Sequence, residues 1–252
     1  MLETIVDLEI VIVSGRRPAL LERTLASFDA RLFRHFDISR VSANLDAFGG
    51  DEADHAACRK ILTSAFPDIV LHEPQTPGFC AAVQRLWAGT TGSAVFHLED
   101  DWLLDEDVRP ADIAGLGRGN VAAMLLLSEH IDWTGPSHDL VSRKVRTRLF
   151  GLPIRTETRP IFGTSPGFFT GAFVREVAAR MNTGLDPEKQ MRGRKKNPAL
   201  SEFVKPLRCQ VLPGRDDRPI IRDIGRQWRD ERQLEKIVHP DGRTEWRKRQ
   251  AA

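Results

Sequence analysis

The sequence predicts an α/β protein with a mostly parallel sheet flanked by helices, on two observations. Residues 8–13 (LEIVIV) form a short apolar run rich in β-branched side chains, which is typical of a strand buried on both faces. Pro18 then begins a stretch in which apolar residues recur with a helical period. The same succession of strand and helix recurs up to residue 101, and such alternation favours parallel strands joined by right-handed crossovers.

The remaining elements are expected from the same patterns. In the first half, further strands are expected at residues 38–45, 69–72 and 94–98, and further helices at residues 55–66 and 79–88. After residue 110 the regular alternation fades. There we expect strands at residues 121–127 and 209–212, helices at residues 171–181 and 200–207, a polar and mobile segment at residues 182–197, and a polar, Arg-rich tail.

The composition is that of an ordinary globular protein and does not indicate a strongly charged partner such as nucleic acid. The 252 residues include 37 Lys and Arg against 35 Asp and Glu, so the net charge of +2 argues neither for nor against nucleic acid. Cys58, Cys80 and Cys209 lie far apart and in no metal-ligand spacing, which is typical of thiols in a reducing compartment. The N-terminus carries acids where a signal peptide carries bases, and no segment approaches the roughly 18 apolar residues of a membrane span. We therefore expect a cytoplasmic protein with no transmembrane segment.

An acidic motif follows the strand expected at residues 94–98. Glu99, Asp100 and Asp101 come directly after it, and ligands bind outside the carboxyl ends of the strands in an open parallel sheet. Adjacent carboxylates repel one another, and a hard cation such as Mn²⁺ or Mg²⁺ offsets that repulsion. Such a cation would also stabilise a diphosphate leaving group. The alternative is the N-terminus of a helix, where the dipole favours acids.

Two ordered blocks of the sequence carry a resemblance to a known family. Residues 10–28 (IVIVSGRRPALLERTLASF) and residues 77–102 (PGFCAAVQRLWAGTTGSAVFHLEDDW) resemble the opening strand, loop and helix and the donor-site core of glycosyltransferases with the Rossmann-like GT-A fold, especially family 2. The second block ends in a motif of the Asp-x-Asp type. The resemblance covers residues 8–105 well and residues 167–175 more loosely.

The resemblance implies a function and a division of the chain. It implies metal-dependent transfer of a sugar from a nucleotide-sugar donor of the UDP or GDP type to a carbohydrate, glycolipid or other small-molecule acceptor, with Mn²⁺ or Mg²⁺ as cofactor. Residues 1–115 would form the donor-binding half. Residues 116–252 would form the acceptor-binding half and a C-terminal lid, within one compact domain.

Site residues follow from the resemblance position by position. Glu99 and Asp101 would be the outer members of the metal motif, with Asp101 the direct ligand and therefore catalytic. The family often has Asn where this chain has Gln84, so the sugar and the base stay open. The donor-binding residues so implied are Ser14, Gly15 and Arg16 for the base and ribose, Asp46 for the base, Gly78 and Phe79 for the turn that faces the nucleotide, and Asp100.

The acceptor half holds the expected general base. Inverting members use a carboxylate in this half to deprotonate the acceptor hydroxyl, and Glu202 is the candidate by position. A capping or surface role for Glu202 stays open, as does retaining chemistry, which needs no such base. Residues 167–171 (GFFTG) would either approach a sugar or pack their two Phe rings in the core. Weaker candidates for the base are Asp186, Asp216 and Asp217.

The C-terminal segment is expected to close over the donor. Arg226 and Arg229 could bind a diphosphate with bidentate hydrogen bonds, and Asp223 could join the metal ligands. Trp228 would anchor the segment when it closes. The alternative is an amphipathic helix with solvent-exposed charges.

Three other functions stay open. A nucleotidyltransferase acting on a sugar phosphate shares the architecture and the metal, but its first loop is usually Gly-rich with a Lys, whereas residues 14–18 are Ser-Gly-Arg-Arg-Pro. A module that binds nucleic acid or a protein through the basic tail leaves the acidic motif unexplained, because acids repel phosphate. We therefore expect no nucleic-acid partner. The third is a non-catalytic nucleotide-binding relative.

Overall fold

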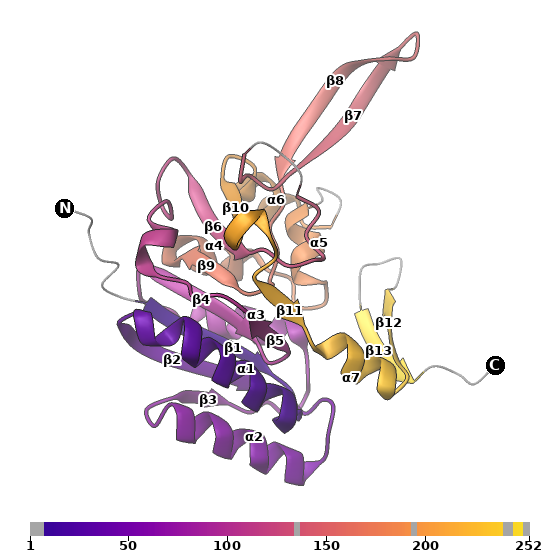
Figure 1. Cartoon of the computed structure of the whole chain (residues 1–252). Coiled ribbons are helices and arrows are strands. Elements are labelled where there is room, and N and C mark those ends of the chain that lie inside the picture. The colour runs from indigo at the N-terminus through magenta and orange to yellow at the C-terminus, as the bar shows by residue number, and fades with distance from the viewer. Residues whose placement is uncertain (1–7, 134–136, 193–195, 239–243, 249–252) are drawn as a thin grey trace.

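The seven-stranded sheet at the centre of the molecule is mostly parallel (Figure 1). The computed structural model describes residues 8–133, 137–192, 196–238 and 244–248. Residues 1–7, which belong to the acidic N-terminus considered above, lie outside the described residues. The strands run in the order β10-β6-β9-β4-β1-β2-β3. Their bounds are β1 Leu8–Ser14, β2 Ile38–Leu45, β3 Val70–His72, β4 Ala94–Glu99, β6 Val121–Leu126, β9 Gly167–Thr170 and β10 Arg208–Leu212.

The pairing of the strands confirms the predicted fold class. β1 is parallel to both β2 and β4, β2 to β3, and β10 to β6. β9 is antiparallel to its neighbours β4 and β6. The close approach of these strands leaves no room for a side chain at Gly167, where a Cβ would lie 2.8 Å from the Met124 carbonyl oxygen. Strands from both sides of residue 115 therefore share one sheet.

Helices cover both faces of the sheet and create two apolar cores. Alternate residues of β1 point to opposite faces, as the period of a strand requires. Ile10 and Ile12 pack with α1 and α2, whereas Val11 and Val13 pack with α3, α4 and α6. The helices are α1 Pro18–Arg31, α2 Glu52–Ala65, α3 Phe79–Ala88, α4 Gly171–Arg180, α5 Pro187–Arg192, α6 Pro198–Val204 and α7 Gly225–Glu231, with short 3-10 turns at Phe33–His35, Pro110–Ile113 and Arg215–Asp217.

Three pairs of strands lie outside the central sheet. β7 (Val141–Leu149) and β8 (Leu152–Pro160) form a long hairpin that projects from the body of the molecule (Figure 1). β5 (Trp102–Leu104) pairs with β11 (Ile221–Asp223), and β12 (Leu234–Val238) pairs with β13 (Thr244–Lys248). The hairpin and the pairing of β11 are not expected from the sequence.

The polar segment at residues 182–197 differs from expectation because it contains α5. Asp186 caps this helix, since its carboxylate accepts the backbone N–H groups of Glu188 and Lys189 at 3.1 and 3.0 Å. Gln190 is buried, and its side chain donates to the Asn182 carbonyl at 3.0 Å. Local hydrogen bonds and the burial of Met191 in the apolar core therefore hold this segment. The cap also gives Asp186 a structural role.

The two Phe rings of the Gly-Phe-Phe-Thr-Gly segment are part of the core. Phe168 and Phe169 lie in β9 with no exposed surface. Phe168 packs on Phe96 at 4.8 Å between ring centroids, and Phe169 packs on Trp87 at 5.2 Å. Their aromatic faces are therefore not available to a sugar, which settles the choice between the two roles considered for this segment.

Candidate donor site at the carboxyl ends of β1 and β4

The order of the strands reverses direction where β1 meets β4. The chain moves from β1 outward to β2 and β3, and then returns to the other side of β1 as β4, with α1 and α3 on opposite faces. Such a switch point is where ligands bind in open α/β sheets. Val13 lies opposite Glu99, and the Asp100 N–H donates to the Val13 carbonyl at 3.1 Å. The loop after β1 and the acidic motif are thus neighbours.

Asp100 organises the loop after β1. Its carboxylate has no exposed surface. One of its oxygens accepts the Ser14 hydroxyl at 3.0 Å and the Gly15 N–H at 2.8 Å, and Arg17 forms an ion pair with the carboxylate. Gly15 passes close to the next loop, because a Cβ there would lie 2.8 Å from the Phe48 carbonyl oxygen. Asp100 therefore positions this loop, and its direct contact with the donor stays a prediction.

Arg17 is the residue of this site that the sequence analysis missed. Its guanidinium also pairs with Asp101 at 2.9 Å and lies 5.5 Å from the Trp228 ring and 6.0 Å from the Phe48 ring. Burial lowers the pKa of Arg17, but attraction by Asp100 and Asp101 outweighs burial and raises it above its ordinary value. A permanent positive charge therefore lies beside the acidic motif. The signal in the sequence is an Arg after the strand, one position beyond the predicted Arg16.

Asp101 and Asp223 converge on one guanidinium. The Arg229 side chain donates to an oxygen of Asp101 at 3.2 Å and to an oxygen of Asp223 at 3.0 Å. The register of β5 and β11 produces this arrangement, because Asp223 lies opposite Trp102 and the Ile224 N–H donates to the Asp101 carbonyl at 2.9 Å. Asp101 and Asp223, 122 positions apart in the sequence, are thus brought together at one end of the sheet.

Asp101 and Asp223 are two carboxylates close enough to share one cation, and in this structure the cation is the Arg229 guanidinium. Hard cations prefer oxygen ligands, and a cation bound with a nucleotide commonly takes one or two protein carboxylates, with phosphate and water completing the shell. Asp101 and Asp223 already face a common positive charge. Among the residues that the structure describes, no group of three or more His, Cys, Asp or Glu side chains is arranged to hold a metal ion by itself. A divalent cation at this place would take Asp101 and Asp223 in place of the Arg229 guanidinium, with phosphate and water as further ligands.

Glu99 lies at the end of β4 and is partly buried. Burial, and repulsion from Asp101, Glu188 and Asp100, raise its pKa well above the ordinary value of a glutamate. Burial also raises the pKa of Asp101, although Arg17 and Arg229 oppose that shift. Glu99 thus carries a proton more readily than an exposed glutamate does.

A buried histidine lies beneath the motif. The Trp87 indole N–H donates to His97 Nδ1 at 3.1 Å, so the imidazole proton lies on Nε2, which is 4.0 Å from Glu99 Oε1. His97 has no exposed surface, and burial lowers its pKa to about 3. His97 is therefore neutral at pH 7 and belongs to the core that supports β4.

The residues predicted to face the base also meet in the structure. The buried Asp46 carboxylate accepts the Gly78 N–H at 3.0 Å and the Asn44 amide at 2.8 Å. Gly78 is the N-cap of α3, and Phe79, the first residue of that helix, is exposed. Asp46 thus links the loop after β2 to the start of α3. Its contacts with other residues are compatible with a structural role, and the base-binding role stays a prediction.

The arginines of the prediction have different partners. Arg16 pairs with Glu52 at 2.5 Å and donates to His55 at 3.2 Å, at the start of α2. Arg226 is exposed and lies on α7, where its backbone N–H and its side chain both donate to Asp223 at 3.1 and 3.3 Å. Arg226 is therefore accessible to a ligand at the same end of the sheet as Arg229.

Glu202 lies in another part of the molecule. It is an exposed residue of α6, 3.8 Å from Arg159 of β8 and 3.9 Å from Lys205. Arg159 also donates to Glu157 at 2.7 Å and to the buried Ser201 at 2.8 Å. These contacts place Glu202 at the base of the β7–β8 hairpin. Its role as the base stays a prediction, and the surface role considered for it is compatible with these contacts.

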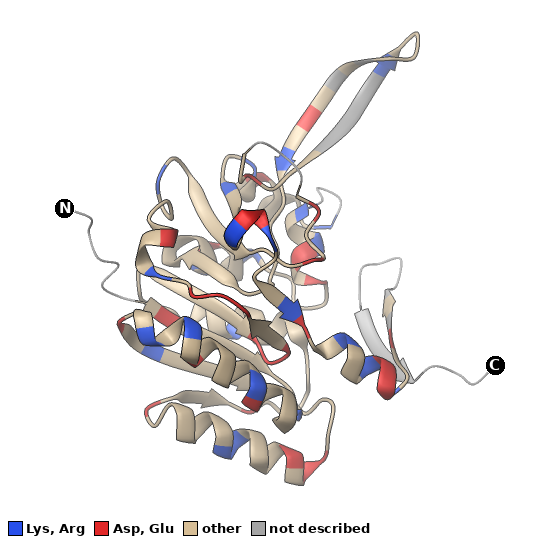
Figure 2. Ribbon diagram, in the orientation of Figure 1, with Lys and Arg blue, Asp and Glu red and all other residues tan. Residues whose placement is uncertain are grey.

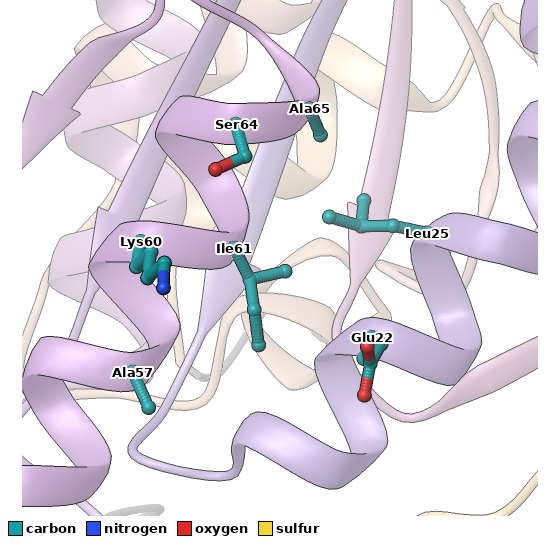
Figure 3. Close-up of a pocket in the computed structure, with 7 residues that line it drawn as sticks. All are labelled: Glu22, Leu25, Ala57, Lys60, Ile61, Ser64 and Ala65. Carbon is teal, nitrogen blue, oxygen red and sulfur yellow. The ribbon is translucent and has the colours of Figure 1, made fainter.

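A second concave feature lies away from these residues. A groove between α1 and α2 has Leu25 and Ile61 along it and Glu22 and Lys60 at its margins (Figure 3). The residues predicted to bind the donor do not line it. Its small and apolar side chains offer few groups that could orient a polar ligand. The carboxyl ends of β1 and β4 are therefore the candidate donor site.

Comparison with known proteins supports the fold. No protein-family model and no curated protein matches this chain. The mannosyltransferase PcManGT from Pyrobaculum calidifontis, in complex with GDP-Man and Mn²⁺, is 15% identical, with a TM-score of 0.50 over 83% of this chain and 58% of its own. GalNAc-T7 with UDP, GalNAc and Mn²⁺ is 12% identical, with a TM-score of 0.56 over 83% of this chain and 43% of its own. TarS 1–349 from S. aureus is 12% identical, with a TM-score of 0.50 over 82% of this chain and 58% of its own.

These likenesses confirm the resemblance at the level of the fold. The chain has the fold of the GT-A glycosyltransferases, with its mostly parallel sheet flanked by helices. It spans between 43% and 58% of the length of the three solved structures. In the part of the chain that the structure describes, no helix is both long and apolar enough to cross a membrane.

Proposed function

We propose that this chain is a metal-dependent glycosyltransferase. It transfers a hexosyl group from a UDP- or GDP-type donor to a carbohydrate, glycolipid or other small-molecule acceptor, with inversion at the sugar carbon. The observation that carries the proposal is the convergence of Asp101 and Asp223 on Arg229 at the carboxyl ends of the strands, within a GT-A fold. Two of the similar structures contain Mn²⁺ with GDP-Man or with UDP and GalNAc.

Asp101 and Asp223 would hold the divalent cation, with Glu99 as a further ligand. The cation, Mn²⁺ or Mg²⁺, neutralises charge on the diphosphate as it leaves. Arg229 and Arg226 are placed to bind phosphate oxygens, since both lie on α7 beside these carboxylates. Arg17 adds a fixed positive charge at the same place. Positive side chains around the phosphates would stabilise the charge that develops there.

The nucleotide would lie along the ends of β1, β2 and α3. Ser14, Gly15 and Arg16 would face the ribose and base, with Asp46, Gly78 and Phe79 on the far side. The link between Asp46 and Gly78 supports this placement, because it joins the two segments into one wall. The donor-binding half would be residues 1–115, and the acceptor-binding half with its lid residues 116–252.

In the inverting reaction, a carboxylate takes the proton of the acceptor hydroxyl as its oxygen attacks the sugar carbon and the diphosphate departs. Glu202 is the proposed base. Glu188 of α5 is a second candidate; its carboxylate accepts the Thr164 N–H at 2.9 Å and pairs with Arg192 at 3.2 Å, and it is one cause of the raised pKa of Glu99. A cytoplasmic location is part of this proposal, and it is supported by three buried free cysteines, Cys58, Cys80 and Cys209.

Release of nucleoside diphosphate tests the proposed function. The chain is incubated with Mn²⁺ and a panel of UDP- and GDP-sugars, with and without simple saccharide acceptors. At least one donor is expected to release nucleoside diphosphate, and Asp223→Asn is expected to abolish the release. The rival function, nucleotidyl transfer, would instead release pyrophosphate from a nucleoside triphosphate and a sugar phosphate. Pyrophosphate release, with no reaction of any nucleotide sugar, would contradict the proposal.

A further inference from the structure

The β7–β8 hairpin ends in an exposed apolar tip. The two strands stay paired from Val141 and Pro160 to Leu149 and Leu152, so the turn contains only two residues. The hairpin extends beyond the rest of the molecule (Figure 1). The exposed fractions at its tip are 54% for Leu149, 96% for Phe150, 69% for Leu152 and 58% for Ile154. Large apolar side chains gathered at an exposed end indicate an interaction surface.

The backbone conformation of the turn does not favour an aromatic residue at Phe150. Phe150 and Gly151 both have positive φ, at 49° and 81°. Two-residue hairpin turns with positive φ at both positions favour Asn-Gly or Asp-Gly, and a bulky side chain is a rare occupant of the first position. The fully exposed Phe150 ring therefore sits on a backbone that a polar Asn would adopt more easily. Bulky residues with positive φ are strained, and strained backbone of this kind is found mostly at functional sites.

The charges of the hairpin indicate what the tip binds. Residues 143–155 contain the five cations Arg143, Lys144, Arg146, Arg148 and Arg155 and no acid. Basic residues mark the described ribbon close to the tip and at the base (Figure 2). Five like charges would repel the same hairpin of a second copy, whereas they complement a surface rich in phosphate. Apolar side chains flanked by Lys and Arg are the combination that binds the interface of an anionic bilayer.

We propose that the β7–β8 hairpin docks this protein on the surface of a membrane that contains anionic lipid. The side chains of Leu149, Phe150 and Leu152 enter the boundary between headgroups and acyl chains, and the exposed Arg148 beside them binds lipid phosphate. This is binding at the surface by a hairpin and does not involve a membrane-spanning segment. The proposal goes beyond the proposed glycosyltransferase activity and does not rest on it, because it concerns residues outside the donor site.

Sedimentation with lipid vesicles tests the proposal. The full chain is mixed with vesicles of phosphatidylcholine alone, and with vesicles that also contain phosphatidylglycerol. We expect the protein to pellet with the anionic vesicles and to be released by added NaCl, because surface charge attraction is screened by salt. Equal binding to both kinds of vesicle, or binding to neither, would overturn the proposal.

Phe150→Asn is the sharpest variant, because it separates folding from binding. Asn-Gly suits the turn, so the melting temperature should stay the same or rise. Binding to anionic vesicles should nevertheless fall at least about tenfold, since the largest apolar group of the tip is lost. Arg148→Gln should lower binding about fivefold. Val141→Thr, at the opposite end of the hairpin, is the matched control and should bind as the wild type does.

Two outcomes would contradict docking by the tip. In the first, Phe150→Asn keeps its fold and binds anionic vesicles as tightly as the wild type. In the second, the wild-type chain is a dimer by analytical ultracentrifugation, Phe150→Asn is a monomer, and neither binds vesicles. That second result would show that the tip pairs two copies of the chain.

Discussion

The Arg17 guanidinium forms an ion pair with the carboxylate of Asp100, which lies 83 residues further along the chain and has no exposed surface. The same guanidinium pairs with Asp101 and lies beside the ring of Trp228. One side chain thus connects the loop after β1, the end of β4 and α7. The geometry of the candidate donor site depends on this connection.

Removal of Arg17 should strongly destabilise the fold. Arg17→Met leaves the buried charge of Asp100 without a cation, and loss of one partner of a buried pair costs about 3–5 kcal/mol. The free energy of unfolding, measured in urea, should fall by that amount. Arg16→Met is the matched control, because Arg16 pairs with the exposed Glu52 and should contribute at most about 1 kcal/mol. Equal losses for the two variants would argue against a special role of the Arg17–Asp100 pair.

His97 should make stability depend on pH in the acidic range. Its pKa is about 3 in the folded chain, against an ordinary value of 6.5, so below pH 6.5 the unfolded chain binds the extra proton. Stability is therefore lost as the pH falls from about 6.5 towards 3. At pH 5 the loss due to this residue should be about 2 kcal/mol relative to pH 7.

His97→Gln provides the comparison. Gln can still accept the Trp87 indole N–H but does not titrate. Urea unfolding at pH 7 and pH 5 should show a smaller loss for the variant, and the difference isolates His97 from other groups. If both proteins lose the same stability between these pH values, His97 is not held neutral by burial.

The first half of the fold could be predicted from the sequence because its signals are local. Residues 10–13 are apolar throughout because both faces of β1 are covered. Glu99 ends β4, a strand of the same kind, and Asp101 follows it two residues later. Arg17 could not be recognised in this way. Its partners, Asp100 and Trp228, are distant in the sequence and are brought to it by the order of the strands.

Several elements of the second half could not be predicted from local sequence patterns, for physical reasons. The β7–β8 hairpin buries little apolar surface, so its strands lack the alternation of apolar and polar residues that predicts a strand. α5 has only six residues, too few to show a helical period in the sequence, and it is capped by Asp186. β11 pairs with β5, from which it is separated by more than 100 residues of sequence, and no local pattern predicts such a pairing.

α7 should act as a lid on the donor side. It begins beside Asp101, where a Cβ at Gly225 would collide with the Asp101 carboxylate, and its Trp228 ring lies 6.5 Å from the Phe48 ring. Proteolysis of residues 215–235 should slow when nucleoside diphosphate and Mn²⁺ are both present, because closure over the donor excludes water and protease. Cleavage at equal rates with and without these ligands would argue that α7 is fixed or inert.

Arg226 should contribute directly to donor binding. Arg226→Ala should weaken binding of the nucleotide sugar by about 1.5–3 kcal/mol, the value of a hydrogen bond to a charged group. Isothermal titration calorimetry measures the change. Arg222→Ala is the control, because Arg222 pairs with Asp105 at 2.6 Å on the surface and should not affect the donor. Normal binding by Arg226→Ala would remove this residue from the site.

Two glutamates can be compared as the general base. Glu202→Gln should lower turnover by about 10² or more with little change in donor binding, as loss of a general base predicts. Glu188→Gln, on α5, is the direct comparison. If Glu188→Gln shows the loss and Glu202→Gln does not, the base is on α5. Near-normal turnover in both variants would indicate retaining chemistry or another acid.

The central claim is that Asp101 and Asp223 hold a divalent cation together with a nucleoside diphosphate. A thermal-shift measurement with UDP and GDP, each with and without Mn²⁺, tests it most directly in the wild type, in Asp101→Asn and in the control Asp105→Asn. The account predicts that one diphosphate stabilises the wild type and the control when Mn²⁺ is present, and that Asp101→Asn folds but loses this stabilisation. Equal stabilisation by diphosphate with and without Mn²⁺, in the wild type and in Asp101→Asn alike, would contradict it.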